Sequence, residues 1–416
     1  MGTTIATIIA IIIMGVLGIT KKMSIACTML VSIVIMLIFN VITFEDAFSD
    51  FGSNTVITFI GMSIVSSALV ETGLLEKICG FLLKIGKKEK LLVIIILIVS
   101  SFVAAFVSNR VTILLFVTIL YELQRKNNDI LPKKFSILIL ISTSIGGLFM
   151  VPTTSTLLIS SNILVNLGYN GFKAMQFAPF AVFQLIILLI YYFTLSKFLF
   201  KKVSKEFKDV ENLQLNKNIN SNNKKQTLAV VILLLCIGFF VFTKIKTGII
   251  AITAAMSCII FKLIDDKKAI KSVNWEIVIM IACAGGISRA LVKSGISSYI
   301  ANNIFSFLNE NTSKVIIVAT ISGIIMITTN FLTMTASASL YIPISIMLAN
   351  RLGLDPMIIA MLVTISAYSS YITPLSSRNA IVLNNSDIKV KDLIIVNGPF
   401  MLILYILNII IFSIIL

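Results

Sequence analysis

The stretch FVAAFVSNRVTILLFVTIL, residues 102–120, breaks a long apolar run with Ser108, Asn109 and Arg110. A charge at membrane depth costs several kcal/mol unless it is paired or hydrated. The apolar arm after this break would be roughly 21 Å long as a helix, which is short of a hydrocarbon core of roughly 30 Å. We therefore expect residues 91–124 to form a re-entrant hairpin whose polar tip lies inside the membrane. The alternative is two full crossings with the tip in an outside loop.

The composition indicates a polytopic membrane protein. The chain has 416 residues, of which 58% are hydrophobic, and its mean hydropathy is +1.04. A soluble fold could not bury that much apolar surface, and several runs approach the roughly 20 residues that span a bilayer. The formal net charge of +16 does not indicate nucleic-acid binding, because the lysines cluster in short loops between apolar runs, as the positive-inside rule predicts.

The chain contains no histidine. Ser–His and Cys–His nucleophile pairs, imidazole metal ligands and histidine proton relays are therefore excluded. The five cysteines have no CxxC spacing and lie in or beside apolar runs, so we interpret them as small core residues. An intramembrane hydrolase built on the many serines and threonines would need a lysine as its base, and no lysine is suitably placed. We expect no enzyme activity, and no cofactor other than Na⁺ as a coupling ion.

A polar segment divides the chain into two similar halves. Residues 201–226 are rich in Asn and Lys, which is typical of a solvated linker. The sequence ALVETG at 68–73 matches ALVKSG at 290–295, and other polar motifs match at nearly the same offset. A consistent offset indicates an internal repeat. We expect the first repeat to occupy residues 1–200 and the second to occupy residues 227–416.

Each half contains five apolar segments and one split stretch that would enter and leave on the same side. The predicted fold is therefore an all-α polytopic membrane protein of two inverted repeats, each with five transmembrane helices, one re-entrant hairpin and one broken helix. The hairpins are expected at about 91–124 and 314–349, and the broken helices at about 134–164 and 355–384.

The lysines and arginines predict the orientation in the membrane. Placing the linker at 201–226 in the cytoplasm puts most of the 34 Lys and Arg residues on the cytoplasmic side. The apolar segment at 4–20 is followed, not preceded, by lysines, so we interpret it as the first transmembrane helix and not as a signal peptide. We expect a multi-pass protein of the cell inner (plasma) membrane with both termini outside.

The two broken helices carry proline and clustered hydroxyl groups. Residues 151–156 read VPTTST, and residues 373–379 read TPLSSRN. Such residues free backbone groups that must be satisfied at membrane depth. Interrupted helices at matching places in two halves are typical of a transporter site, because exposed helix N-termini suit anions and unwound carbonyls suit small cations. A proline kink repaired by Ser and Thr is the simpler alternative.

The charges indicate that the substrate is an anion. All 18 acidic residues lie in loops or near helix ends, so we expect no buried carboxylate to hold a cation or a proton. Arg110 at one tip and Arg378 at one break have hydroxyl and amide neighbours, and guanidinium groups match carboxylate or sulfate oxygens. Snorkelling toward the cytoplasmic face is the alternative for Arg378. Arg289, near the outer end of its helix, is interpreted as structural.

Three parts of the sequence together resemble the divalent anion/sodium symporter family. They are the first tip, the stretch SSRNAIV at 376–382, and the stretch VNWEIVIMIACAGGISRALVKSG at 273–295. That family belongs to the ion transporter superfamily, which also includes arsenite permeases. The resemblance covers nearly the whole chain. It implies a homodimer that moves citrate, succinate or sulfate by an elevator-like shift of the domain that bears the hairpins.

The resemblance also implies site residues. Family members carry Ser-Asn-Thr at both tips and a Thr-Pro-Pro-Asn type of element at the breaks. Together with the charge pattern, this predicts a substrate site made of Ser108, Asn109, Arg110, Thr333, Thr335, Ser377, Arg378 and Asn379. It also predicts a sodium site made of Ser108, Asn109, Thr153, Thr154, Ser155 and Thr373.

Three departures from the family pattern concern charge and sodium. Arg110 stands where the first tip has threonine, Thr333-Met334 stand where the second has Ser-Asn, and Arg378 stands where the break has proline. Methionine is a poor sodium ligand. We hypothesise that a fixed guanidinium supplies part of the charge compensation that bound sodium supplies in relatives, so that the protein exchanges anions or depends on fewer sodium ions.

The predicted function is a secondary active transporter of small anions, namely di- or tricarboxylates or sulfate. It would work by elevator-type alternating access and be either sodium-coupled or anion-exchanging. The alternatives are an arsenite or other oxyanion permease and, less favoured because buried carboxylates are missing, a sodium/proton antiporter of the same superfamily. The expected partners are the small anion, the lipid bilayer and a second copy of the chain, and not nucleic acid.

Overall fold

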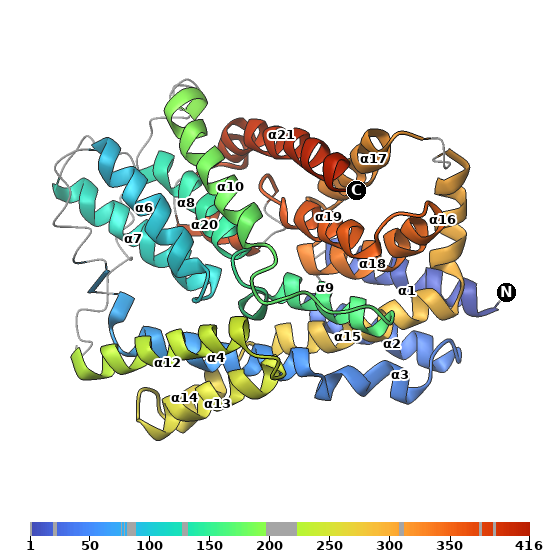
Figure 1. Ribbon diagram of the computed structural model, residues 1–416, viewed down its shortest axis with the longest axis horizontal. Coiled ribbons are helices and arrows are strands. Elements are labelled where there is room, and N and C mark those ends of the chain that lie inside the picture. Colours follow the sequence, from blue (N-terminus) through green and yellow to red (C-terminus); the bar gives the residue numbers. More distant parts are fainter. Residues whose placement is uncertain are drawn as a thin grey trace.

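The computed structural model describes residues 2–19, 23–75, 77–78, 80, 89–126, 132–196, 223–307, 312–373, 377–385 and 388–416. These residues form helices and connecting loops, and none of them lies in a strand (Figure 1). The prediction of an all-α fold is confirmed for this part of the chain. The predicted linker at 201–226 lies outside the described residues except for 223–226, which begin a helix.

The helices that precede the linker are α1 (Gly2–Ile19), α2 (Ile25–Ile38), α3 (Phe44–Phe48), η1 (Ser49–Gly52), α4 (Asn54–Glu71), α6 (Glu89–Ala104), α7 (Asn109–Lys126), α8 (Pro132–Gly146), η2 (Val151–Thr153), α9 (Ser155–Asn166), α10 (Ala178–Tyr191) and η3 (Tyr192–Ser196). Those that follow it are α12 (Asn223–Phe242), α13 (Thr247–Ile260), α14 (Asp266–Ser272), α15 (Trp275–Lys293), α16 (Ile296–Phe307), α17 (Lys314–Thr328), α18 (Met334–Arg351), α19 (Pro356–Tyr368), α20 (Ser377–Asn385) and α21 (Val390–Ile415).

Helices are interrupted at the polar positions that the sequence singles out. In the first half, α6 and α7 are separated by residues 105–108, and α8 and α9 by a segment that contains η2. In the second half, α17 and α18 are separated by residues 329–333, and α19 and α20 by residues 369–376. Pro152 lies in η2, where its missing N–H prevents α8 and α9 from joining into one helix.

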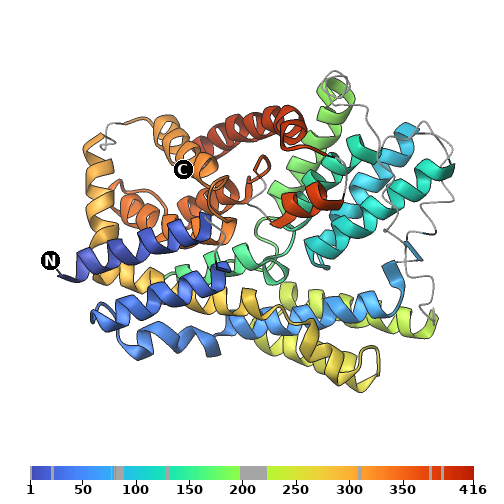
Figure 2. The same cartoon turned by 180° about the vertical axis from the view of Figure 1, so that it is seen from behind.

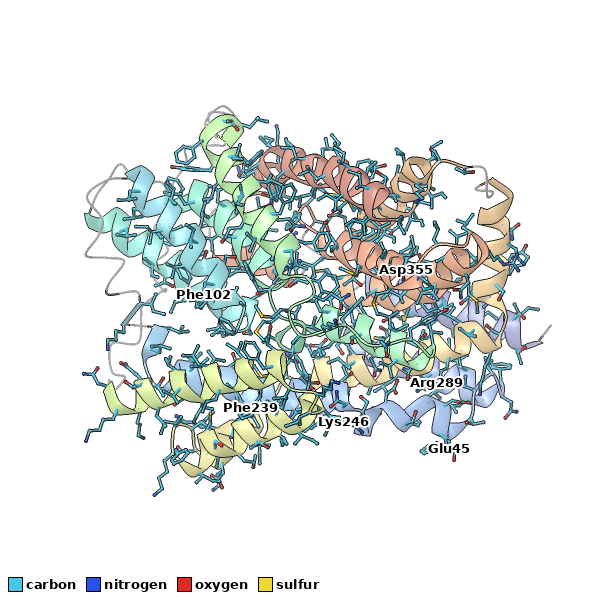
Figure 3. The ribbon with its side chains drawn as sticks, viewed as in Figure 1. Glu45, Phe102, Phe239, Lys246, Arg289 and Asp355 are labelled. Atoms are coloured by element: carbon cyan, nitrogen blue, oxygen red, sulfur yellow. The ribbon has the colours of Figure 1, made fainter. Side chains whose placement is uncertain are left out.

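Several helices present apolar surface to the outside of the molecule. Within the described ranges, five helical segments are long and apolar enough to cross a membrane, namely Phe44–Glu71, Ala178–Leu195, Asn223–Phe242, Trp275–Lys293 and Val390–Ile415. Phe102 and Phe239 lie on the outside of the ribbon (Figure 3), and Phe239 is 47% exposed. Such faces would be unfavourable in water, whereas lipid tails solvate them well.

Small residues allow the helices to approach one another closely. α4 packs along α13, and a Cβ atom placed on Gly61 would lie only 2.5 Å from the carbonyl carbon of Ala251. In lipid, helix association depends on such close van der Waals contact, because the tails are as apolar as the side chains. Gly61 therefore sets the distance between α4 and α13.

Helix α9 lies in the middle of the molecule in both views (Figures 1 and 2). It packs against α4 and α15 and also against α18 and α19. Helix α20, by contrast, packs against α7 and α8. The N-terminus of α9, at the first break, therefore lies where elements from both halves of the chain meet.

Helix α16 falls in a stretch for which the sequence predicts no helix. Its residues, ISSYIANNIFSF, mix apolar with Ser and Asn side chains, so they do not stand out as an apolar run. The helix packs against α15 and α18. Its helical conformation is thus supported by tertiary contacts more than by hydropathy.

The cysteines largely follow expectation. Cys236, Cys258 and Cys283 are buried in the core. Cys27 is exposed, which corrects its interpretation as a core residue, and Cys79 lies outside the described residues.

Candidate functional site

A cavity of about 400 Å³ lies between α4 and the elements of the two tips and breaks. It is lined by Phe59, Met62, Ser63, Ser66, Ser67, Val70, Ala104, Phe106, Val107, Ser108, Asn109, Val111, Thr153, Thr154, Ser155, Thr156, Ser272, Asn274, Ile277, Met334, Tyr368 and Arg378. None of these lining residues carries a carboxylate. Six of the residues predicted from sequence are brought together here, namely Ser108, Asn109, Thr153, Thr154, Ser155 and Arg378.

Arg378 supplies a buried positive charge to this cavity. It lies in the first turn of α20, and only 2% of it is exposed, so it does not snorkel to the surface. Its Nη2 donates to the sulfur of Met334 at 2.6 Å and to the carbonyl oxygen of Tyr368 at 3.2 Å. Its Nε and Nη1 are buried with no hydrogen-bond partner in the described structure. A buried guanidinium with free donors favours an anion as its partner.

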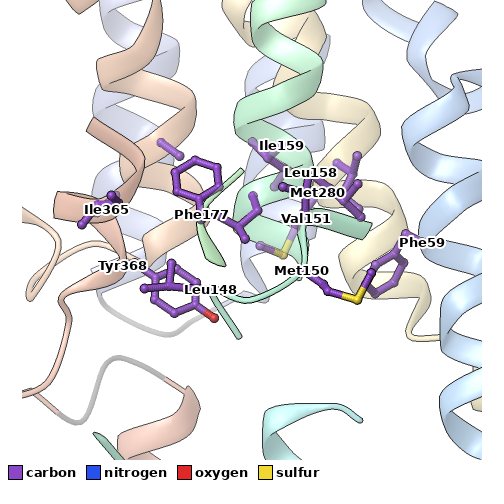
Figure 4. Close-up of a cluster of buried hydrophobic side chains, with 14 of the residues drawn as sticks. Phe59, Leu148, Met150, Val151, Leu158, Ile159, Phe177, Met280, Ile365 and Tyr368 are labelled. Carbon is purple, nitrogen blue, oxygen red and sulfur yellow. The ribbon is translucent and has the colours of Figure 1, made fainter. Parts of the chain in front are cut away.

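Tyr368 ends α19 at the second break and holds Arg378 from one side. The guanidinium carbon lies 4.7 Å from the centre of its ring, a distance that permits a cation–π interaction. Figure 4 shows the ring beside Leu148, and Phe59, another lining residue, on the opposite side of a cluster of buried apolar side chains. No pattern in the sequence indicated Tyr368 as a site residue.

The first tip lies at the cavity, as the sequence predicts. The hydroxyl of Ser108 accepts from the backbone N–H of Val111 at 3.5 Å, and its carbonyl accepts from Thr112 at 3.1 Å. These bonds begin α7 at the tip. Arg110 lies in the first turn of this helix, but its side chain lies outside the part of the chain that the structure describes.

The first break presents a helix N-terminus to the cavity. Thr154 precedes α9 and makes no side-chain capping bond; its hydroxyl donates to the carbonyl oxygen of Gly147 at 2.6 Å. The next residues, Ser155 and Thr156, line the cavity. The N-terminal N–H groups of a helix, together with its dipole, favour a bound anion.

The second tip contributes Met334 rather than its threonines. Thr333 caps α18 by accepting from the backbone N–H of Ala336 at 3.3 Å, and its hydroxyl lies 3.1 Å from that of Thr335. Neither threonine lines the cavity. Between them, the sulfur of Met334 reaches Arg378, so this tip serves to position the guanidinium.

The remaining predicted residues hold the second break together. Asn379 donates to the carbonyl oxygen of Thr373 at 2.7 Å, and the hydroxyl of Thr373 donates to the carbonyl oxygen of Asn330. Neither Asn379 nor Thr373 lines the cavity. The side chain of Ser377 lies outside the described residues.

Helix α4 forms a polar wall that the sequence analysis missed. Ser63, Ser66 and Ser67 line the cavity, and the hydroxyl of Ser63 donates to the carbonyl oxygen of Phe59 at 2.7 Å. Ser272 and Asn274, from the α14–α15 junction, lie along the same cavity. Serines three and four residues apart fall on one face of a helix, and this spacing is the signal that could have revealed them.

The expectation that no carboxylate is buried is wrong for Asp50. It is 5% exposed, and its Oδ2 accepts from Asn166 at 2.9 Å, from Asn162 at 3.1 Å and from Arg289 at 3.2 Å. Gly285 allows this, because a Cβ there would lie 1.4 Å from the same oxygen. Asp50 is buried because η1 folds back onto α9 and α15, which the linear pattern does not reveal. It does not line the cavity, and Arg289 has the structural role expected of it.

A second buried carboxylate is Asp392, in the first turn of α21, which is 4% exposed. It accepts from the backbone N–H of Lys389 at 3.0 Å. This places it at a helix N-terminus, where a carboxylate is favourable. It too is absent from the cavity lining.

The chain resembles known transporters in sequence and in fold. A family model described as a citrate transporter matches residues 9–364. The chain is 22% identical over 415 residues to the sodium-dependent dicarboxylate transporter SdcS of Staphylococcus aureus (strain USA300), and the match covers 90% of this chain and 79% of SdcS. It is 28% identical over 192 residues to the uncharacterized transporter sll0640 of Synechocystis, covering 45% of this chain and 30% of that protein.

Two solved transporters have a similar fold. The YdaH transporter of Alcanivorax borkumensis matches with a TM-score of 0.66 and 12% identity, over 91% of this chain and 88% of its own. MtrF of Neisseria gonorrhoeae matches with a TM-score of 0.63 and 14% identity, over 92% of this chain and 84% of its own. At these identities the likeness shows the fold alone.

Proposed function

The chain belongs to the citrate transporter family, and on that premise we propose that it carries small di- or tricarboxylates across the inner membrane as a secondary active transporter. It is a multi-pass membrane protein of a transporter family and not an enzyme, as expected. SdcS is by its name a sodium-dependent dicarboxylate transporter, which favours dicarboxylates over sulfate, arsenite or other oxyanions. A sodium/proton antiporter is disfavoured, because none of the described residues that line the cavity carries a carboxylate.

One observation carries this proposal. Arg378 is 2% exposed, its Nε and Nη1 have no partner in the described structure, and it lines a cavity whose described lining residues include no acidic side chain. An isolated buried cation is strongly unfavourable. A carboxylate bound in the cavity would supply the missing counter-charge, and the N-terminus of α9 and the hydroxyl groups around it would supply further donors.

Uptake by purified protein in liposomes tests the proposal. The Arg378→Gln variant should lose at least tenfold in the uptake of labelled succinate or citrate, because a hydrogen bond to a charged group contributes about 1.5–3 kcal/mol. Arg351→Gln is the matched control, since Arg351 is exposed at the end of α18 and should transport like the unaltered protein. Equal uptake by the Arg378 and Arg351 variants would rule out the anion site.

Two inverted repeats, 1–200 and 227–416, account for the packing of the helices. Helix α4 packs on α13 while α15 packs on α2, and α7 packs on α20 while α18 packs on α9. The two contacts in each pair are equivalent if α2 corresponds to α13, α4 to α15, α7 to α18 and α9 to α20. A pseudo-two-fold axis produces contacts of this kind. The tips, α6–α7 and α17–α18, would then be the two re-entrant hairpins.

We propose alternating access on the basis of which helices enclose the cavity. Helix α4 packs against α13, α14 and α15, whereas α20, which carries Arg378, packs against α7 and α8. The cavity lies between these two groups, so a shift of one against the other would carry the anion past α4. We propose that this is the elevator-type movement, with the α4 group as the fixed part.

Sodium is proposed as a coupling ion at the first tip and break. The cavity lining includes Ser108, Asn109, Thr153, Thr154 and Ser155, whose side-chain and backbone oxygens are the kind of ligand that suits a hard cation. The second tip and break offer less, because the sulfur of Met334 at the tip accepts from Arg378 and the hydroxyl of Thr373 at the break donates to Asn330. We also propose that residues 201–226 lie in the cytoplasm and that both termini lie outside. The protein is further proposed to form a homodimer.

A further inference from the structure

The hydroxyl group of Tyr368 is buried and has no hydrogen-bond partner in the described structure. The residue is 1% exposed and lines the cavity. A buried hydroxyl that makes no hydrogen bond loses its hydration without compensation. A free donor beside a cavity that already contains an unpaired guanidinium therefore indicates a ligand that binds to both.

Gly147 makes room for this hydroxyl. A Cβ atom on Gly147 would lie 2.1 Å from the hydroxyl oxygen of Tyr368 and 3.3 Å from the amide nitrogen of Asn109. The phenol and the amide thus flank the same space above Gly147, and they come from the second break and the first tip. Both groups can donate a hydrogen bond to an oxygen placed between them and the cavity.

Tyr368 also fixes where Arg378 lies. Its carbonyl oxygen accepts from Nη2 at 3.2 Å, and its ring lies 4.7 Å from the guanidinium carbon. These contacts leave Nε and Nη1 free. One residue therefore sets the spacing between the free edge of a cation and a hydroxyl donor.

We propose that Tyr368 is a specificity-determining residue that selects anions with two acidic groups. One carboxylate binds to Arg378, and the second accepts a hydrogen bond from the Tyr368 hydroxyl beside Asn109. The substrate class is then the short dicarboxylates, and monocarboxylates bind only at Arg378. This inference rests on the proposed function and adds to it a residue that neither the charge pattern nor the family motifs assign.

The experiment compares a dicarboxylate with a monocarboxylate of the same chain length. Full-length protein in liposomes takes up labelled succinate, and unlabelled succinate or butyrate competes. In Tyr368→Phe, the concentration of succinate for half-inhibition should rise about tenfold or more, since a hydrogen bond to a charged group is lost. The concentration of butyrate for half-inhibition and the maximal rate of succinate uptake should change less than about threefold, because the ring that holds Arg378 is kept.

Three variants make the result specific. Tyr405→Phe is the matched control, because the Tyr405 hydroxyl donates to the Ala319 carbonyl oxygen at 3.0 Å and lies outside the cavity lining. Gly147→Ala should weaken the binding of succinate more than that of butyrate, because the new methyl group would displace the Tyr368 hydroxyl. Tyr368→Leu should weaken both anions, because it also removes the ring from Arg378, and Phe at the same position should restore butyrate binding. Thermal unfolding without ligand checks that each variant is folded.

Two outcomes would overturn the inference. If Tyr368→Phe matches the unaltered protein, or weakens succinate and butyrate equally, Tyr368 does not select dianions although anion transport stands. If the unaltered protein takes up neither succinate nor citrate and neither raises its unfolding temperature, the proposed function fails, and the role of Tyr368 fails with it.

Discussion

Asp50 and Arg289 form a charge pair in which only 7% of the Asp50 side chain and 17% of the Arg289 side chain are exposed. Removing one partner of such a pair leaves the other charge buried and uncompensated, which costs about 3–5 kcal/mol. We expect Arg289→Met to lower the stability of the protein near the lower end of that range, because Asn162 and Asn166 still donate to Asp50. Thermal unfolding in detergent would measure it.

Lys293 provides the matched comparison on the same helix. It pairs with Asp46, but half of its side chain is exposed, and such surface pairs contribute about 1 kcal/mol or less. Lys293→Met should therefore unfold close to the unaltered protein. Equal destabilisation by the two variants would show that burial of the Asp50–Arg289 pair does not matter.

Single residues were predictable only where chemistry conflicts with hydropathy. Arg378 stands out in the sequence because a charge within an apolar segment needs an explanation, and the structure brings it into the cavity. Tyr368 and Ser66 do not stand out, because a tyrosine or a serine in a helix is usual. Asp50 looks like an ordinary loop residue, and its burial depends on Gly285, which is 235 positions away along the chain. Only the folded structure reveals such contacts.

The contact of α4 with α13 depends on Gly61. A Cβ there would lie 2.5–2.8 Å from backbone atoms of Ala251 and Ile252, and backbone atoms cannot swing aside as a side chain can. We expect Gly61→Ala to destabilise the protein by about 1–3 kcal/mol through overpacking. Gly238→Ala on α12 is the control, since nothing lies within 4 Å of its Cβ position, and alanine there should be neutral or stabilising. If both variants unfold at the same temperature, α4 and α13 are not closely packed.

At the scale of helices, the sequence predicted interruptions better than packing. The breaks after α8 and α19 follow from Pro, Thr and Ser residues whose local chemistry ends a helix. The hydrogen bond that repairs the first break, from Thr154 to Gly147, is local, whereas at the second break Thr373 donates to Asn330, which is 43 positions away along the chain. Helix α16 was not predicted, because its mixed apolar and polar sequence is stabilised as a helix by packing against α15 and α18. Which helices pack together depends on shape over long distances, and one sequence does not show it.

In net uptake, the carrier must return across the membrane empty after it has released its anion. Arg378, at the second break, gives the empty site one positive charge, and we propose that Arg110, at the first tip, gives it a second. A bound dianion would cancel both, so the loaded carrier would move through the membrane nearly neutral. The empty carrier would move with uncompensated positive charges, which are costly at membrane depth, unless sodium or a second anion changes the net charge of the site. Sodium adds positive charge, whereas a second anion removes it.

We therefore expect exchange of anions to be faster than net uptake. Liposomes preloaded with unlabelled succinate should take up labelled succinate at least tenfold faster than empty liposomes under the same sodium gradient, since a difference of 1.4 kcal/mol in the return step is already tenfold. In Arg110→Gln the empty site carries one charge less, so the ratio between preloaded and empty liposomes should fall. Uptake that does not respond to internal succinate, in both proteins, would mean that the two arginines do not govern the return of the empty carrier.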